Sequence, residues 1–169
     1  QAQIQIRQRD ADEPVHEILE NPAIQYLPKQ ADGDVFFDME GFPYESDGGL
    51  EYLFGNWTRD GGFKGFWAHN REEEKQAFID FMTWVVERME RFPGAHIYHY
   101  ASYEQTALRR LSIRHGVMQS ELADLQREGR FVDLYPIVLK SIRVGEPKYS
   151  IKNLESHYGF KDRKSTRLN

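Results

Sequence analysis

The sequence predicts an α/β fold in which a mixed β-sheet is flanked by helices, and three observations along its 169 residues lead to that prediction. Three apolar segments follow one another with short turns between them, which is typical of neighbouring antiparallel strands. Helical and strand-like segments then alternate, which is typical of parallel strands joined by helices. A hydrophobic fraction of 40% and an aromatic fraction of 14% are sufficient for a folded core.

The strands are predicted from short apolar runs bounded by turn residues. Gly41 and Pro43 end the first run, and Asp60-Gly61-Gly62 favours a hairpin between the second and the third. The predicted strands are residues 34–40, 50–57, 63–68, 95–100 and 131–134.

The helices are predicted from periodicity and capping residues. Residues 71–91 carry apolar side chains on one helical face, and acids at its start suit the helix dipole. Ser102 and Ser150 are candidate N-caps, and Gly159 is a candidate helix end. The other predicted helices are residues 15–20, 102–115, 120–127, a turn from Pro136, and 151–158.

Composition excludes several classes of protein. A net charge of −5 argues against a broad basic surface for duplex binding, and the absence of cysteine excludes disulfides and thiolate zinc sites. No apolar run approaches the roughly 20 residues of a membrane-spanning helix, so we expect a cytoplasmic protein with no membrane contact. Residues 1–33 are predicted to be a linker before a domain at 34–169, and we expect the chain to be a piece of a larger protein.

Asp38 and Glu40 form the sharpest motif in the sequence. Alternate residues of a strand point to the same face, so the two carboxylates lie side by side next to an apolar run. Like charges held together repel, and a divalent cation with hard oxygen ligands removes that penalty. The alternative is that the strand simply reaches the solvent here, with two hydrated acids.

Glu104 is a third candidate, just after the fourth predicted strand and at the start of a helix. An acid at this position can reach the end of a neighbouring strand. Alternatively, Glu104 only complements the positive end of the helix dipole.

Residues 35–160 resemble the DEDD exonuclease superfamily, which has an RNase H-like fold, and within it the RNase H-like domain of RecB-like nuclease–helicase proteins. Its first motif, an apolar strand ending in D-x-E, is similar to Asp38-Met39-Glu40. Its second motif, H-N-x-x-F-D, is similar to residues 99–104 (HYASYE), with Glu104 in place of the Asp at the ligand position. Residues 131–134 resemble the fifth strand of the family, and residues 149–155 the helix that follows it.

The last motif of that superfamily is an acid preceded four positions earlier by His or Tyr. Asp162 with the residues after it resembles the end of this motif, although the chain has almost no room for the helix that carries it. A missing segment before Asp162 would explain the departure. One alternative is that Tyr158 and Asp162 themselves form the Tyr-x-x-x-Asp motif, but Gly159 would break the helix that carries it. The other alternative is that Asp162 belongs to a polar tail.

The resemblance implies a 3′–5′ exonuclease that hydrolyses single-stranded DNA or RNA ends with two Mg²⁺ or Mn²⁺ ions. Asp38 would bridge the ions, Glu40 and Glu104 would complete their coordination, and Asp162 would close the set. A helicase domain in the same full-length protein is an implied partner. The alternatives are a catalytically inactive module that binds nucleic acid or a partner domain, an endonuclease of the same fold, and an unrelated phosphatase.

Weaker candidates have an ordinary structural explanation. Asp133 can hold a helix N-terminus, and His99 can be structural even if it lies near the site. Phe42, Tyr44 and Tyr103 could stack bases. We expect the tryptophans in the core and the basic residues on a solvated face, namely Trp57, Trp67, Trp84, Arg109, Arg110, Arg114, Lys148 and Lys152.

Overall fold

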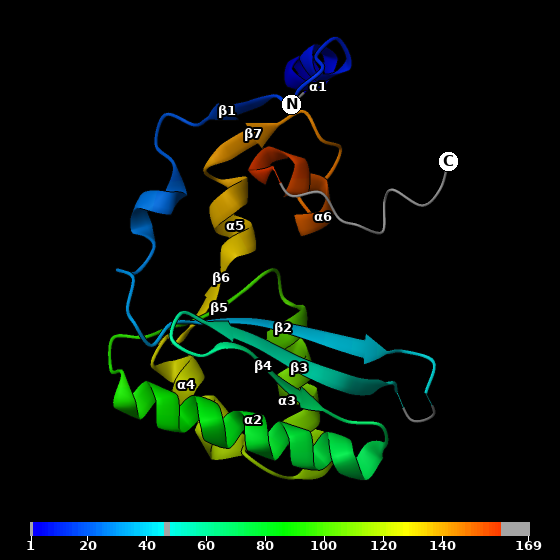
Figure 1. The fold of residues 1–169 in the computed structure, drawn as a ribbon, viewed down its shortest axis with the longest axis vertical. Helices are drawn as coiled ribbons and strands as arrows, with labels where there is room; N and C mark the ends of the chain where they lie inside the picture. The colour runs from blue at the N-terminus through cyan, green and yellow to red at the C-terminus, as the bar shows by residue number, and fades with distance from the viewer. Residues whose placement is uncertain (1, 46–47, 160–169) are drawn as a thin grey trace. The chain divides into compact units, whose positions relative to one another are not determined.

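The computed structural model describes residues 2–45 and 48–159, and it divides into two compact units (Figure 1). Residues 28–133 form one unit, and residues 1–27 together with 134–169 form the other. We describe each unit by itself. The prediction of a linker at 1–33 and a single domain at 34–169 stays a prediction.

The unit of residues 28–133 is built on a five-stranded sheet in the order β4-β3-β2-β5-β6. The pairs β2–β3 and β3–β4 are antiparallel, whereas β2–β5 and β5–β6 are parallel. The predicted α/β fold with a mixed sheet is therefore confirmed. The strands are β2 (Val35–Phe42), β3 (Leu50–Thr58), β4 (Gly62–Trp67), β5 (Ile97–His99) and β6 (Phe131–Asp133).

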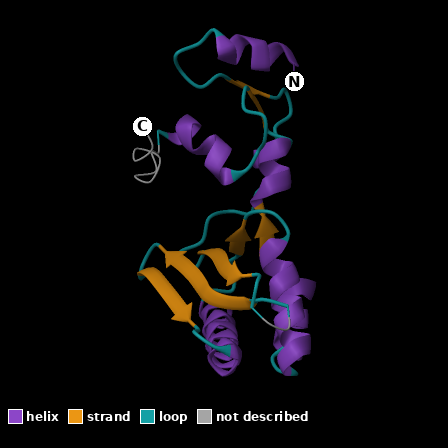
Figure 2. Cartoon of the chain, turned by 90° about the vertical axis from the view of Figure 1, so that its right-hand side faces the viewer, coloured by secondary structure: helices purple, strands orange, loops and turns teal. Residues whose placement is uncertain are grey.

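Three helices of this unit lie on one face of the sheet (Figures 1 and 2). The Asn70 side chain caps the first of them by accepting from the backbone N–H groups of Glu72 and Glu73. Ser102 begins the second helix, but its side chain makes no capping hydrogen bond, so the predicted cap is wrong. The helices are α2 (Arg71–Arg91), α3 (Tyr103–His115) and α4 (Gln119–Arg127).

The core lies between the sheet and α2, α3 and α4. Along β2, Val35, Phe37 and Met39 are buried in this core, and the Phe37 and Phe81 rings stack with centroids 4.6 Å apart. The alternate residues of β2 lie on the opposite face of the sheet.

Two of the three tryptophans were predicted to be buried and are not. Trp57 is 49% exposed and Trp67 is 54% exposed, because both belong to the strand positions that alternate with the core residues of β3 and β4. Trp84 is half-buried and packs against Phe66, with ring centroids 5.9 Å apart.

The other unit pairs the start of the chain with its later part. β1 (His16–Ile18) pairs antiparallel with β7 (Ile142–Val144), so the predicted helix at 15–20 is wrong, because pairing with a distant strand overrides its local preference. Ser150 caps the next helix as predicted, accepting from the backbone N–H of Asn153, and Gly159 ends the last turn with a φ of 68°. The remaining elements are α1 (Ala2–Arg9), η1 (Ala23–Tyr26), α5 (Leu134–Leu139), α6 (Ile151–Leu154) and η2 (Glu155–Tyr158).

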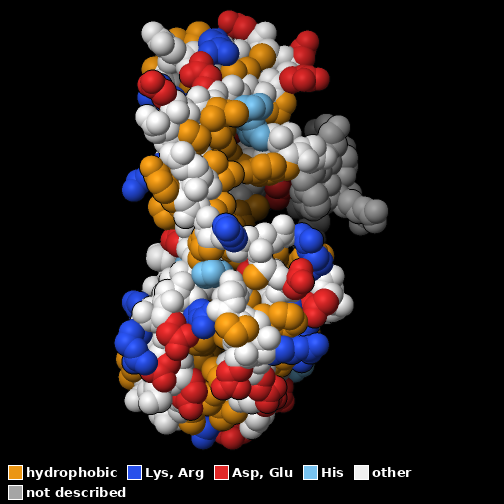
Figure 3. Space-filling model, turned by 90° about the vertical axis from the view of Figure 1, so that its left-hand side faces the viewer, with side chains coloured by type: hydrophobic (Ala, Val, Ile, Leu, Met, Phe, Trp, Pro, Cys, Tyr) orange, Lys and Arg blue, Asp and Glu red, His pale blue; other side chains and the backbone are white. Residues whose placement is uncertain are grey.

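An open pocket of about 250 Å³ lies within this second unit. Its walls are mostly aliphatic, with His16 and His157 among them, and Figure 3 shows hydrophobic side chains beside histidines at the surface of this unit. Burial lowers the pKa of His157, and the neighbouring His16 adds to that effect. Within the described residues, no helix is both long enough and apolar enough to cross a membrane.

Candidate metal centre

Strand β2 places Asp38 and Glu40 on the face of the sheet that points away from the helical core. Both side chains are exposed, while Phe37 and Met39 between and beside them are buried. Asp38 lies opposite Gly55 of β3. The neighbouring position on β3 therefore carries no side chain that could shield the carboxylate.

Glu104 is brought toward Asp38 by the loop between β5 and α3. Asp133, at the end of β6, accepts a hydrogen bond from the backbone N–H of Ala101 at 2.8 Å. Ala101 has a φ of 71°, in the left-handed region that a residue with a Cβ rarely adopts, so this hydrogen bond supports an unfavourable backbone conformation. Glu104 follows this loop in the first turn of α3, and it is 4% exposed.

The Asp38 and Glu104 carboxyl groups lie close together, within hydrogen-bonding reach of each other. Partial burial raises the pKa of Asp38 above its ordinary value of 3.8, and the negative charge of Glu104 raises it further. The charge of Glu40 acts in the same direction. The ionised form of Asp38 is therefore disfavoured by its two acidic neighbours.

Glu104 also has a buried carboxylate oxygen, Oε2, that lacks a hydrogen-bond partner among the described residues. His99 Nδ1 lies 3.6 Å from Glu104 Oε2, but His99 Nδ1 bonds the Ala101 carbonyl at 2.7 Å and His99 Nε2 accepts from Gln105 Nε2 at 3.0 Å. Both ring nitrogens of His99 thus hydrogen-bond other groups, and the N-terminal end of α3 favours a negative charge at Glu104.

The structure brings together some of the predicted ligands and leaves others apart. Asp38 and Glu104 are in contact, and Glu40 is close enough for its charge to act on Asp38. In the part of the chain that the structure describes, no three His, Asp or Glu side chains are arranged as a ready-made metal-binding group. Asp162 lies outside the described residues, and its role as a ligand stays a prediction. Asp133 takes the alternative role considered for it, since it holds the loop before α3.

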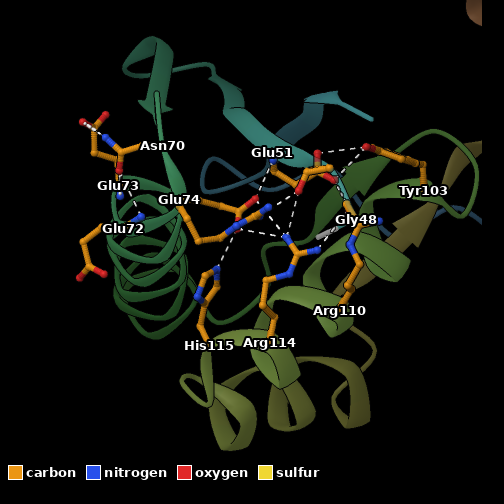
Figure 4. Close-up of polar contacts among 12 residues, drawn as sticks. Gly48, Glu51, Asn70, Glu72, Glu73, Glu74, Tyr103, Arg110, Arg114 and His115 are labelled. Carbon is orange, nitrogen blue, oxygen red and sulfur yellow. Dashed lines mark hydrogen bonds and ion pairs between the residues drawn. The ribbon is translucent and has the colours of Figure 1, made fainter. Parts of the chain in front are cut away.

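A second acidic cluster in the same unit was not found from the sequence. Glu74 of α2 is fully buried, and its Oε2 accepts from Arg71 at 2.7 Å, from Arg114 at 3.2 Å and from His115 at 2.8 Å (Figure 4). Burial raises the pKa of Glu74, but hydrogen bonds from Arg71, the Glu51 backbone N–H and His115 outweigh it, so that the pKa lies below its ordinary value.

Glu51 of β3 belongs to the same cluster and is 2% exposed. Its carboxylate accepts from the Tyr103 hydroxyl at 3.0 Å and forms an ion pair with Arg110. Arg110 and Arg114 therefore form ion pairs with buried acids and are not only part of a solvated face as predicted. An acid inside the otherwise apolar run Leu50–Phe54 was the available signal, together with basic residues at helical spacing on α3.

A family model described as the RNase_H superfamily matches residues 35–168, which is well over half of the chain. The chain therefore belongs to the RNase H superfamily. Members are typically phosphodiester hydrolases and usually use divalent metals. Searches of curated proteins and of solved structures gave no match.

Proposed function

We propose that the protein is a metal-dependent nuclease that hydrolyses phosphodiester bonds of nucleic acid at the site formed by Asp38, Glu40 and Glu104. One observation carries the proposal: Asp38 and Glu104 are held in contact with no Lys or Arg paired to either among the described residues. Two adjacent carboxylates of this kind favour the binding of a hard divalent cation.

The donors on this part of the chain fit Mg²⁺ or Mn²⁺. Asp38 and Glu40 offer exposed carboxylate oxygens on one strand, and Glu104 offers a buried oxygen without a partner. A pair of such ions would supply an activated water and stabilise the leaving oxygen. The role of the protein groups is to hold phosphate-binding cations at a defined place beside an open sheet face, with Asp162 as a further proposed ligand.

The finer assignment is a 3′–5′ exonuclease of the DEDD type acting on single-stranded DNA or RNA ends. The order of the D-x-E strand, the acid at the start of α3 and the β6 strand supports this assignment. An open pocket of about 250 Å³ next to the end of β2 is lined by Phe42 and Tyr103, whose rings suit stacking with a base. We further propose an RecB-like context, in which a helicase domain of the full-length protein presents the strand.

A second candidate is a catalytically inactive module of the same fold that binds nucleic acid or a partner domain. The absence of a three-residue metal group among the described residues favours this candidate. The presence of Glu104 where the second motif of the superfamily has Asp favours the inactive module too. The two candidates differ in one property that can be measured, which is hydrolysis.

The test is a nuclease assay with 5′-labelled single-stranded DNA and RNA oligonucleotides and Mn²⁺. The nuclease proposal expects cleavage by the wild-type protein and background cleavage by Asp38→Ala. Asp80→Ala, which removes an exposed Asp from α2, is the matched control and should keep wild-type activity. Cleavage by Asp38→Ala equal to wild type would exclude this site, and no cleavage by wild type would favour the inactive module.

Two substrates separate the finer alternatives. A circular single strand has no end, so an exonuclease leaves it intact while an endonuclease linearises it. A 3′-blocked linear strand tests the polarity, because a 3′–5′ enzyme should lose most of its activity on it.

A further inference from the structure

The Glu51 carboxylate connects the two elements that carry the proposed metal ligands. It lies on β3 and is buried, and it accepts both from Tyr103 of α3 and from Arg110 of α3. Tyr103 and Arg110 are seven residues apart, which is about two helical turns, so they share a face of α3 and converge on one carboxylate (Figure 4).

An irregularity in the sheet aims Glu51 at α3. Glu40 lies opposite Leu53, but the next residue, Gly41, lies opposite Glu51, so that Tyr52 is an extra residue on β3. A β-bulge of this kind turns the following side chain toward a new direction. The bulge occurs directly beside Glu40, at the end of the strand that also carries Asp38.

Gly41 makes the close approach of Glu51 to β2 possible. A Cβ at position 41 would lie 2.5 Å from Glu51 Oε2 and 2.8 Å from the Tyr103 hydroxyl. Glycine is therefore the residue that fits between β2 and the Glu51–Tyr103 pair. The end of β2, the carboxylate of β3 and the first turn of α3 meet at one point.

Tyr103 is adjacent to Glu104, and this adjacency links the Glu51 cluster to the proposed metal centre. Successive residues of an α-helix project about 100° apart, so fixing the direction of Tyr103 also fixes the direction of Glu104. Arg110 contacts the same carboxylate two turns later, so Glu51 contacts α3 at two points along its length.

We propose that Glu51, acting through the Tyr103 hydroxyl and Arg110, is a positioning residue that holds Glu104 against Asp38 for metal binding. The proposal rests on the proposed function of the Asp38–Glu104 site. Glu51 is not a metal ligand in it, because the carboxylate is occupied by Tyr103 and Arg110.

Tyr103→Phe tests the proposal, because it removes the hydroxyl and keeps the aromatic ring that could stack a base. Mn²⁺ affinity should fall by roughly tenfold, as is common when the partner that orients a metal ligand is lost. The value of kcat should fall as well, while KM for an oligonucleotide stays unchanged. Tyr149→Phe is the matched control, since it removes a hydroxyl that donates to the Ile142 carbonyl at 3.3 Å in the other unit.

Gly41→Ala disturbs the same contact from the side of the strand and should weaken Mn²⁺ binding in the same direction. Affinities are measured by calorimetry at low temperature, on variants whose circular dichroism matches that of the wild type. If Tyr103→Phe fails that criterion, Gly41→Ala or Arg110→Lys takes its place.

Three outcomes decide the matter. Weaker Mn²⁺ binding by Tyr103→Phe, with Tyr149→Phe unchanged, supports the positioning role. Wild-type affinity and kcat in both Tyr103→Phe and Gly41→Ala overturn it, provided that Asp38→Asn loses Mn²⁺ binding. If Asp38→Asn binds Mn²⁺ as the wild type does, the proposed function itself fails.

Discussion

Two acidic clusters in the unit of residues 28–133 differ in whether basic groups of the protein compensate their negative charge. Glu74 is fully buried and is surrounded by Arg71, Arg114 and His115. Asp38 and Glu104 face each other, and neither has an ion pair with Lys or Arg among the described residues. The first cluster is neutralised within the protein, whereas the second lacks the positive charge that a bound cation would supply.

The titration of the two clusters reflects this difference. The pKa of Glu74 lies below its ordinary value because hydrogen bonds and ion pairs outweigh burial, whereas burial and the charge of Glu104 raise the pKa of Asp38. Ionised Glu74 therefore stabilises the fold, and ionised Asp38 destabilises it. This difference agrees with a structural role for Glu74 and with the binding site that we propose at Asp38.

The largest expected effect is the loss of stability in Glu74→Gln. The substitution leaves the half-buried basic groups around position 74 without a counter-charge. Breaking a buried pair typically costs about 3–5 kcal/mol, and the partial exposure of these groups places the expected loss at the lower end. Urea denaturation at pH 7 measures the change. Glu73→Gln, the exposed neighbour, is the control; equal losses in the two variants would mean that the buried cluster has no special structural role.

Glu104→Gln should behave in the opposite way. Without metal it should not lower stability, because it removes a repulsive charge beside Asp38. Binding at a Mn²⁺ concentration of about 100 times Kd should stabilise the wild type by about 2.7 kcal/mol, and the variant should lose most of that gain. Thermal unfolding with EDTA and with Mn²⁺ measures both; an equal gain in both proteins would contradict the role of Glu104.

Asp38→Asn should show a smaller effect that depends on pH. A raised folded-state pKa means that the contribution of Asp38 is fully present below its ordinary value of 3.8 and is lost as the pH rises through the raised value. Asn does not ionise, so in EDTA the variant should have the higher Tm at pH 7, and the two Tm values should converge below pH 3.8. A Tm difference that is constant across this range would exclude the titration of Asp38 as its cause.

The smallest effect is expected at an exposed ion pair. Asp60 pairs with Arg88 at 2.6 Å, and the Asp60 side chain is 47% exposed. Solvent screens such pairs, so Asp60→Asn should leave Tm close to that of the wild type. A loss of stability comparable to that of Glu74→Gln would show that solvent exposure does not weaken the contribution of this ion pair.

Local patterns in the sequence predicted much of the fold. The helix at 71–91 was predicted with the bounds it has, because apolar periodicity and first-turn acids coincide. The five strands of the main sheet were predicted because each is an apolar run between turn residues. The strand at His16–Ile18 was not, since its partner Ile142–Val144 is more than a hundred residues away.

Only part of the candidate site was predicted, because contacts between distant segments are again not visible in local patterns. The shared face of Asp38 and Glu40 follows from strand alternation alone. The contact between Asp38 and Glu104 depends on the loop that Asp133 holds, which local patterns do not specify. The Glu51 contacts depend on a bulge and on a glycine at position 41, and the sequence carried only the hint of an acid within an apolar strand.

The central claim is that Asp38 and Glu104 are held together to bind a divalent cation. Isothermal titration of Mn²⁺ into the wild-type protein and into Asp38→Asn tests it most directly. We expect saturable binding by the wild type and at least about tenfold weaker binding by the variant. Equal affinities in the two proteins, or no binding by a folded wild type, would contradict the claim.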